Sequence, residues 1–356
     1  MRRRPRLLLS KQALMGNYQR LSQLSGQAAC AASVKAGGYG LGIAFVAPTL
    51  WEAGCRTFFV AYLQEAAALR ALLPDAEIYV FHGLDPGDLD DYRRLAIRPV
   101  LNTLEELTFA RGAELSPAVH IDTGMRRLGL DIEQLDALHA FVTDEPVPLL
   151  MSHLANADQP QHPMNTLQLN CFQSVVEAFQ GQIPAFSFAN TAAVMLGQAY
   201  HFDLTRPGIG LYGGSPDPAC PAGFDAVATW QASVLQVRSL PPGVPVGYGC
   251  SYVTSDETTI ATLSIGYADG YFRALGNRAS VCVNGCLLPI VGRVSMDLIT
   301  IDATALIASG ESIQRGDWVE LMGSQMTVDQ LALDSGTISY EVLTRLGTRL
   351  ERKLVA

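Results

Sequence analysis

The stretch TFFVAYLQEAAALRALLPDAEIYVF (residues 57–81) contains a complete strand–helix–strand unit. Its two short apolar runs, 57–61 and 77–81, have the length of buried strands. The segment between them, residues 63–73, is rich in alanine and leucine and has the character of an amphipathic helix. A strand followed by a helix and a second strand is typical of a parallel βα unit, so this stretch predicts an α/β fold.

The same alternation continues on both sides, from residue 28 to about residue 212. Further helix-like segments follow, and Thr103 and Asn165 are predicted N-caps of two of them. A closed (β/α)8 TIM barrel is expected, because there are eight strand candidates. A doubly wound open sheet is the alternative, but no GxGxxG motif follows the first strand. The strand candidates are residues 28–34, 57–61, 77–81, 98–101, 118–121, 148–153, 185–189 and 206–212, and the helix candidates are 63–73, 103–112, 131–142 and 165–179.

Beyond residue 222 the pattern changes to the alternation with period two that is typical of β-strands. Asn284-Gly285 marks a hairpin turn. A linker rich in proline and glycine, residues 216–223, precedes this region. We therefore expect a barrel domain over residues 1–222 and a smaller, mainly β domain over 223–356. The strand-rich segments are 229–240, 258–267, 279–302 and 317–323.

Composition excludes several classes of protein. Of 356 residues, 49% are hydrophobic, and the net charge of −9 argues against a nucleic-acid surface. No stretch is long enough to span a membrane, and the leucine run near the N-terminus is too short for a signal peptide. The seven cysteines are odd in number and mostly scattered, which predicts reduced thiols and a cytoplasmic location. Cys282 and Cys286 have no histidine nearby, so no metal site is expected.

The carboxyl ends of barrel strands form the reactive face of such a fold. Lys35 lies at the end of the first apolar run, and no acidic residue lies within residues 33–42. Burial there would lower the pKa of the lysine and make its amine a nucleophile. Barrels of this kind often bind phosphate after strands 7 and 8. A lysine facing a phosphate site suggests pyridoxal phosphate held as a Schiff base. Further candidates follow the ends of strands 5, 6 and 7, namely Asp122, Arg127, His153, Asn190 and Thr191. Arg206 is expected to open the eighth strand, with Gly208 and Ile209 behind it.

Nine motifs, in order along almost the whole chain, resemble those of the bacterial alanine racemases. Any one of them alone would be a weak signal, but their number and order are specific. They are VKAGGYGLG (34–42), IDTGMRRLG (121–129), MSHLANAD (151–158), FANTAA (188–193), TRPGIGLYGG (205–214), VGYG (246–249), IGYADGY (265–271), VGRVSMD (291–297) and GTISYE (336–341).

The resemblance implies a pyridoxal-phosphate enzyme that interconverts L- and D-alanine and supplies D-alanine for peptidoglycan. It assigns two bases, Lys35 and Tyr248, to opposite faces of the substrate Cα, as inversion of that carbon requires. It also implies a homodimer in which Tyr248 is contributed by the partner subunit. Arg206 would face the pyridine nitrogen, where a guanidinium makes the ring a weaker electron sink than a carboxylate partner does.

The resemblance assigns roles to further residues. The hydrogen-bond chain near Tyr248 would include His153 and Arg206, and Arg127 would bond that tyrosine. The implied cofactor-binding residues are Lys35, Tyr39, His153, Asn190, Thr191, Arg206, Gly208, Ile209 and Tyr340, the implied substrate contacts are Arg127 and the Met296 backbone, and the implied entrance residues are Tyr267 and Asp158.

This chain departs from the family pattern at three places. Gly37 and Gly38 replace the usual asparagine or aspartate followed by alanine, which adds backbone freedom beside Lys35. His120 stands where many members have a carbamylated lysine that bridges toward Arg127, so another group must position that arginine. Leu41 replaces a common histidine. None of these changes removes a base.

Other functions remain open at this level. A racemase of broader specificity, acting on serine for instance, would share the same motifs. The fold-related basic amino-acid decarboxylases lack the Tyr248 motif. A non-enzymatic pyridoxal-phosphate carrier would be a single barrel, and the long β-rich C-terminal region argues against it. The sequence does not separate a biosynthetic from a catabolic role.

Overall fold

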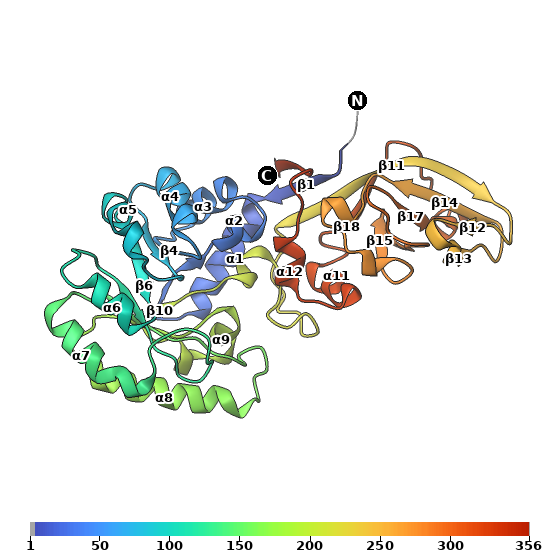
Figure 1. Ribbon diagram of the computed structural model, residues 1–356. Helices are drawn as coiled ribbons and strands as arrows, with labels where there is room; N and C mark the ends of the chain where they lie inside the picture. Colours follow the sequence, from blue (N-terminus) through green and yellow to red (C-terminus); the bar gives the residue numbers. More distant parts are fainter. Residues whose placement is uncertain (1–3, 356) are drawn as a thin grey trace. The chain divides into compact units, whose positions relative to one another are not determined.

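The computed structural model describes residues 4–355, which form two compact units (Figure 1). Residues 15–211 make the barrel unit, and residues 4–14 together with 212–355 make the β unit. The division differs from the expected one in two ways: the boundary falls after residue 211 instead of 222, and strand β1 (Arg6–Ser10) joins the β unit. There β1 pairs antiparallel with β11 (Ala228–Leu240) and parallel with β19 (Glu351–Val355), so strand pairing outweighs nearness in sequence.

Parallel strands form the core of the barrel unit, as predicted. One end of the sheet is completed by β10 (Leu204–Thr205), which pairs in parallel with β2 (Ala29–Cys30), and β2 leads directly into β3. The Asp203 N–H bonds the Phe186 carbonyl at 3.0 Å and the Arg206 N–H bonds the Ala189 carbonyl at 2.8 Å, which joins β10 to β9. The sheet is therefore closed. Its seven-stranded part runs β3 (Ala32–Ser33), β4 (Thr57–Val60), β5 (Glu77–Val80), β6 (Arg98–Leu101), β7 (Ala118–His120), β8 (Leu149–Met151) and β9 (Phe186–Ser187).

Helices follow the strands around the barrel (Figure 1). The Thr103 hydroxyl accepts the Glu106 N–H at 3.2 Å, which confirms the predicted cap of α6. The predicted cap at Asn165 is wrong, because α8 begins at Pro163 and the His162 side chain accepts the Met164 N–H. The helices are α1 (Lys11–Leu24), α3 (Ile43–Glu52), α4 (Leu63–Leu72), α5 (Leu89–Arg94), α6 (Leu104–Ala110), α7 (Leu135–Asp144), α8 (Pro163–Phe179) and α9 (Thr191–Leu196).

The eighth strand differs from its prediction. Residues 206–212 do not form the strand; β10 ends at Thr205, and Ile209–Tyr212 form a short 3-10 helix, η4. Pro207 has no N–H to donate to a ladder, and the N–H groups of Gly208 and Gly210 bond the Thr191 side chain instead. Arg206 therefore follows the strand rather than opening it, and lies at its carboxyl end.

The β unit is built on an eight-stranded sheet, as the period-two pattern predicts. Asn284 and Gly285 both have positive φ, 49° and 82°, which matches the predicted two-residue hairpin turn. Besides β1, β11 and β19, the sheet contains β14 (Thr258–Leu263), β15 (Ser280–Val283), β16 (Cys286–Pro289), β17 (Ile299–Asp302) and β18 (Trp318–Met322), and the unit adds the pair β12 (Pro245–Val246) and β13 (Tyr252–Val253) and helices α10 (Thr304–Ala308), α11 (Val328–Ser335) and α12 (Ser339–Thr344).

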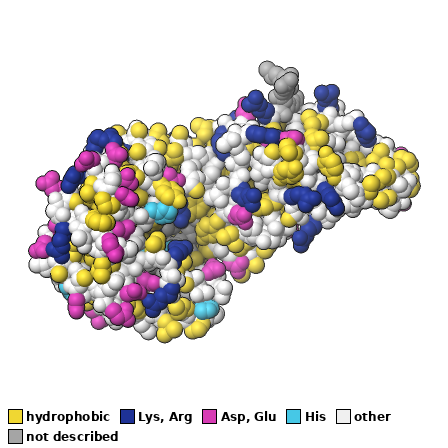
Figure 2. Space-filling model, in the orientation of Figure 1, with side chains coloured by type: hydrophobic (Ala, Val, Ile, Leu, Met, Phe, Trp, Pro, Cys, Tyr) yellow, Lys and Arg dark blue, Asp and Glu magenta, His cyan; other side chains and the backbone are white. Residues whose placement is uncertain are grey.

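The two units differ in charge. Residues 15–211 contain 20 acidic and 11 basic side chains, whereas the remaining residues contain 14 of each, so the net charge of −9 lies on the barrel unit. On the face shown in Figure 2, acidic side chains are spread over the barrel unit at the left and basic ones predominate on the β unit. Among residues 4–355, every helix is too short or too polar to cross a membrane.

Candidate active site

Lys35 follows strand β3 and begins an unusual turn. The next five residues, Ala36 to Gly40, all have positive φ, between 51° and 80°. Consecutive left-handed residues cost L-amino acids roughly 1–2 kcal/mol each, a cost that glycine avoids. A Cβ on Gly38 would also lie 2.8 Å from the Val46 Cγ2 atom. The glycines after Lys35 therefore allow a left-handed turn at the end of the strand.

The sequence around Lys35 contains no acidic residue, but a carboxylate from helix α4 lies beside this turn. One Glu65 oxygen accepts the Gly37 N–H at 3.3 Å and the other accepts the Ala61 N–H at 2.9 Å. Burial and the charge of Arg127 lower the pKa of Lys35, and Glu65 opposes this shift. The balance favours a neutral amine more than in a free lysine. Glu65 was missed by the sequence analysis because it lies 30 residues from Lys35.

Arg206 follows strand β10 directly and is buried. One guanidinium nitrogen, Nη2, donates to the Ser152 carbonyl at 2.7 Å, and Nη1 donates to the Ser187 hydroxyl. Burial lowers the pKa of Arg206 to about 9, so it remains a cation at neutral pH. Arg206 and Lys35 each lie near one ring of a stacked aromatic pair: the Arg206 Cζ is 5.8 Å from the centre of the Phe59 ring, and the Lys35 Nζ is 5.6 Å from that of the Phe81 ring, which stacks on Phe59.

His120, at the end of β7, is held in one tautomer by Asn102. The Asn102 amide nitrogen donates to the Val100 carbonyl at 2.7 Å and to the Phe81 carbonyl at 3.2 Å. Its oxygen, 3.0 Å from His120 Nδ1, must therefore accept a proton from that nitrogen. Burial, with the charges of nearby arginines, lowers the pKa of His120 to about 4. The ring is thus neutral at pH 7, with a lone pair on Nε2.

The loop after β7 carries Arg127. One Asp122 oxygen accepts the N–H groups of residues 124, 125 and 126 at 2.8–3.1 Å, which fixes the start of the loop. Arg127 itself is exposed. His153 follows β8, and burial together with the charges of Arg206, His120 and Arg127 lowers its pKa well below the usual value. The structure thus brings the predicted residues Lys35, Arg127, His153 and Arg206 into one electrostatically coupled cluster with His120.

A second set of predicted residues gathers after β9 and β10. The Thr191 hydroxyl accepts the Gly208 N–H at 2.9 Å and the Gly210 N–H at 3.4 Å, which leaves its own proton free to be donated. A Cβ on Gly208 would overlap the Tyr39 hydroxyl oxygen, so any larger residue there would force Tyr39 to move. Asn190 caps α9 by accepting the Ala193 N–H at 3.0 Å. Ile209 is buried.

Four predicted residues lie in the β unit. Tyr248 begins a short 3-10 helix, η5 (Tyr248–Cys250), and 72% of its surface is exposed. Tyr267 begins another, η6 (Tyr267–Asp269), and its N–H donates to the Ser295 carbonyl at 3.0 Å. Met296 is adjacent to Ser295 and is half exposed. Tyr340 lies in α12 and is partly buried. The remaining predicted residue, Asp158, is exposed between β8 and α8 of the barrel unit.

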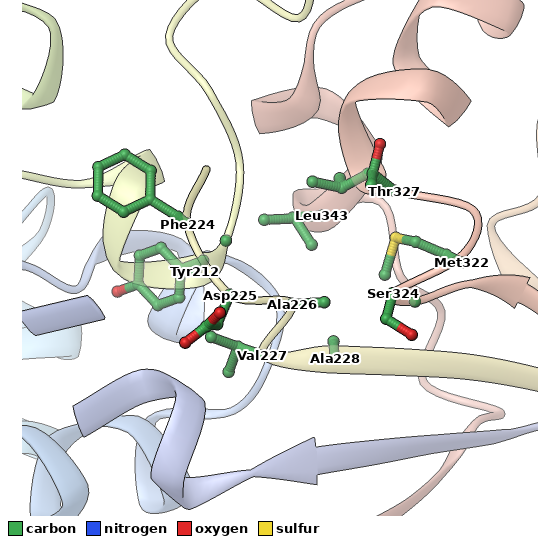
Figure 3. Close-up of a pocket in the computed structure, with 13 residues that line it drawn as sticks. Tyr212, Phe224, Asp225, Ala226, Val227, Ala228, Met322, Ser324, Thr327 and Leu343 are labelled. Atoms are coloured by element: carbon green, nitrogen blue, oxygen red, sulfur yellow. The ribbon is translucent and has the colours of Figure 1, made fainter. Parts of the chain in front are cut away.

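The β unit also contains a cavity of about 200 Å³ between residues 212–228 and the segment that leads into α11 (Figure 3). Tyr212, Phe224, Met322 and Leu343 are among its lining residues, and none of the predicted site residues lines it. Within residues 4–355, no group of three or more histidine, cysteine, aspartate or glutamate side chains is arranged to hold a metal ion.

Comparison with known proteins shows which family shares these features. The family model described as alanine racemase, N-terminal domain, matches residues 9–216, and the model for the C-terminal domain matches residues 227–354. An alanine racemase of Methylobacterium sp. is 43% identical over 98% of this chain and 97% of its own. A catabolic alanine racemase of Agrobacterium fabrum is 44% identical over 96% of this chain and 90% of its own.

A solved structure agrees with the sequence comparisons. Alanine racemase from Bartonella henselae, which carries covalently bound pyridoxal phosphate, superposes with a TM-score of 0.91 at 39% identity, over 99% of this chain and 100% of its own. Both domain models match in their usual order and the likeness extends over nearly the full length, so this chain belongs to the alanine racemase family.

Proposed function

We propose that this chain is a pyridoxal-phosphate-dependent racemase that interconverts L- and D-alanine. The observation that carries the proposal is Lys35, the only lysine among residues 15–211, at the carboxyl end of a barrel strand with a lowered pKa. The relative from Bartonella henselae holds pyridoxal phosphate covalently, and the curated relatives are named alanine racemases.

The residues around Lys35 fit this cofactor. Its phosphate would meet the Thr191 hydroxyl, which has a proton to donate, and the backbone at Gly208, where a Cβ would overlap the Tyr39 hydroxyl. Arg206 would hold the pyridine nitrogen; its contacts with Ser187 and Ser152 use two of five guanidinium N–H groups. When bound, pyridoxal phosphate supplies an aldehyde carbon that an amine can attack and a ring that withdraws electrons from the substrate Cα.

Racemisation needs a proton removed from one face of the Cα and returned on the other. We assign the first face to Lys35, because its lowered pKa keeps part of the amine able to accept a proton. We assign the second to Tyr248, whose side chain is 72% exposed and therefore open to a substrate. His120 is held as a neutral acceptor by Asn102. We assign it the further role of helping to position Arg127, which would contact the substrate carboxylate.

The site is proposed to form in a homodimer in which Tyr248 serves the Lys35 site of the partner subunit. Such sharing follows naturally from a two-fold interface, where each subunit contributes the same residues to the other. The enzyme would act in the cytoplasm, which agrees with seven unpaired cysteines, and would supply D-alanine for peptidoglycan.

Chiral analysis of products tests the reaction directly. Purified protein is incubated with pyridoxal phosphate and single L-amino acids, including alanine and serine. The proposal expects D-alanine as the main product, with the reverse conversion from D-alanine. Faster conversion of serine than of alanine would replace the substrate assignment, and no racemisation of any amino acid would refute the function.

Two inactive variants test the shared site. Lys35→Ala and Tyr248→Phe each lack one base in both sites of their own dimers. Random exchange of subunits gives about half mixed dimers, in which one site collects both intact bases, so roughly a quarter of wild-type activity should return. If both bases came from one chain, mixing would restore nothing. Subunit exchange is verified separately with differently tagged chains.

A further inference from the structure

Arg349 joins two loops of the β unit that carry residues of the proposed site. Its Nε donates to Asp269 Oδ1 at 2.8 Å, and its Nη2 donates to Asp297 Oδ1, also at 2.8 Å. Asp269 ends the η6 turn that begins with Tyr267, and Asp297 follows Met296 directly. One planar guanidinium therefore spans both loops, a geometry that its rigid fork of donors favours.

The contact on the Tyr267 side is built into the fold. Asp269 is 1% exposed, and its second oxygen accepts the Gly266 N–H at 3.0 Å, so the carboxylate closes the turn around Tyr267. The Asp269 carbonyl accepts the Gly347 N–H at 2.9 Å, which holds the segment of Arg349 against the same turn. Both the side chain of Arg349 and the backbone two residues before it are therefore bonded to Asp269.

The two loops also touch each other through their backbones. The N–H groups of Tyr267 and Ala268 donate to the carbonyls of Ser295 and Met296, both at 3.0 Å. A Cβ on Gly266 would overlap the Met296 carbonyl oxygen. With so close an approach, a small shift of one loop displaces the other, and the bond from Arg349 to Asp297 limits that shift.

We propose that Arg349 is a positioning residue that holds the loops of Tyr267 and Met296 in a fixed relation, and so sets how well the substrate is bound. The role in substrate binding rests on the proposed function, because it is the resemblance to alanine racemases that implies Tyr267 at the entrance and the Met296 backbone as a substrate contact. The mechanical part does not: the connection between the loops depends only on the contacts above.

Asp297→Asn is the main test variant, because Asp297 is exposed and its loss leaves the buried Asp269 paired with Arg349. Asp144→Asn is the matched control, since Asp144 is an equally exposed aspartate paired with Arg111 at 2.7 Å on the barrel unit. Arg349→Lys keeps the charge but replaces the fork with a single ammonium.

Hydrogen–deuterium exchange reports on the loops without requiring activity. Asp297→Asn and Arg349→Lys are expected to speed exchange in peptides covering 265–271 and 294–298, whereas Asp144→Asn leaves them unchanged.

In the racemase assay the first two variants should raise KM for alanine about three- to tenfold, with kcat within twofold. Unchanged exchange in both would overturn the positioning role. Altered exchange with a KM equal to wild type would overturn its link to substrate binding. A wild-type protein without racemase activity, but with altered exchange in the variants, would count against the proposed function alone.

Discussion

The barrel unit and the β unit place their site residues in different ways. In the barrel, His120 is the last residue of a parallel strand and Lys35, His153 and Arg206 follow the ends of others, so the closed sheet brings them to one face. In the β unit, Tyr248 and Tyr267 begin short 3-10 turns between strands, and contacts from distant segments such as that of Arg349 hold the second turn. A repeated topology places residues by rule, whereas turns in a mixed sheet depend on particular contacts.

The units also differ in charge and in titratable groups. The barrel unit carries the whole net charge of −9 and all six histidines, and the β unit is neutral by count and has none. Sensitivity to pH between about 5 and 8 should therefore belong mainly to the barrel, because histidine is the side chain that ordinarily titrates there.

The largest expected effect compares the two proposed bases, one from each unit. Lys35→Ala should lower kcat/KM by about 10⁴-fold or more, since it removes both a base and the covalent attachment, while Tyr248→Phe should lower it by about 10²–10⁴-fold. Borohydride reduction and peptide mapping should place the pyridoxyl group on Lys35. A label on Lys11 or Lys353 would contradict the assignment, and Lys353→Ala, in exposed β19, serves as the control.

Glycine substitutions compare a turn at the site with one away from it. Gly38→Ala restores the alanine usual in the family, but in this chain it combines a φ of 72° with an approach of 2.8 Å to Val46 and should cost about 2–3 kcal/mol of stability. Gly285→Ala in the β-unit hairpin has a φ of 82° with open space around the added Cβ, and should cost about 1 kcal/mol. Urea unfolding measures both. Activity should fall only for Gly38→Ala; equal losses of activity would mean that the turn beside Lys35 has no special role.

Acidification should destabilise the barrel unit through His120, and this effect is expected to be smaller than those above. The pKa of His120 is lowered from 6.5 to about 4 in the folded chain, so below pH 6.5 the unfolded chain binds a proton that the folded chain does not. Stability should therefore fall as the pH drops from 6.5 to 4, by at most about 3 kcal/mol from this residue. His120→Asn should flatten the dependence of the unfolding free energy on pH. An unchanged slope would show that His120 does not carry it.

The last prediction is that the racemase rate stays the same when carbon dioxide is removed. The family resemblance places His120 where many members have a carbamylated lysine, and Lys35 is the only lysine in the barrel unit, so activity should not depend on carbon dioxide. Removing bicarbonate should leave the rate unchanged. A mass increase of one carbamate on Lys35 that follows activity would contradict this, and the measurement needs only intact-protein mass spectrometry beside the assay.

Most of the barrel could be predicted from sequence because its signals are local. Seven of the eight predicted strands overlap observed ones, from 28–34 to 185–189, and the helices at 63–73 and 103–112 were placed correctly. The eighth failed because apolar residues around Pro207 and Gly208 resemble a strand, although proline cannot donate to the ladder. The sequence does not indicate that residues 6–10 join the β unit, because the strand partners of β1 lie more than 200 residues away.

Sequence alone determined the family, the barrel and the identity of the proposed bases, because motifs and periodicity depend on residues that are neighbours in the chain. Only the tertiary structure showed that Glu65 is the carboxylate beside the Lys35 turn, that Asn102 selects the tautomer of His120, and that Arg349 ties two loops together. Each of these contacts joins residues from 18 to 80 positions apart. Hydrogen bonds and charge interactions act through space over a few ångströms, and no local pattern encodes which distant side chain will arrive there.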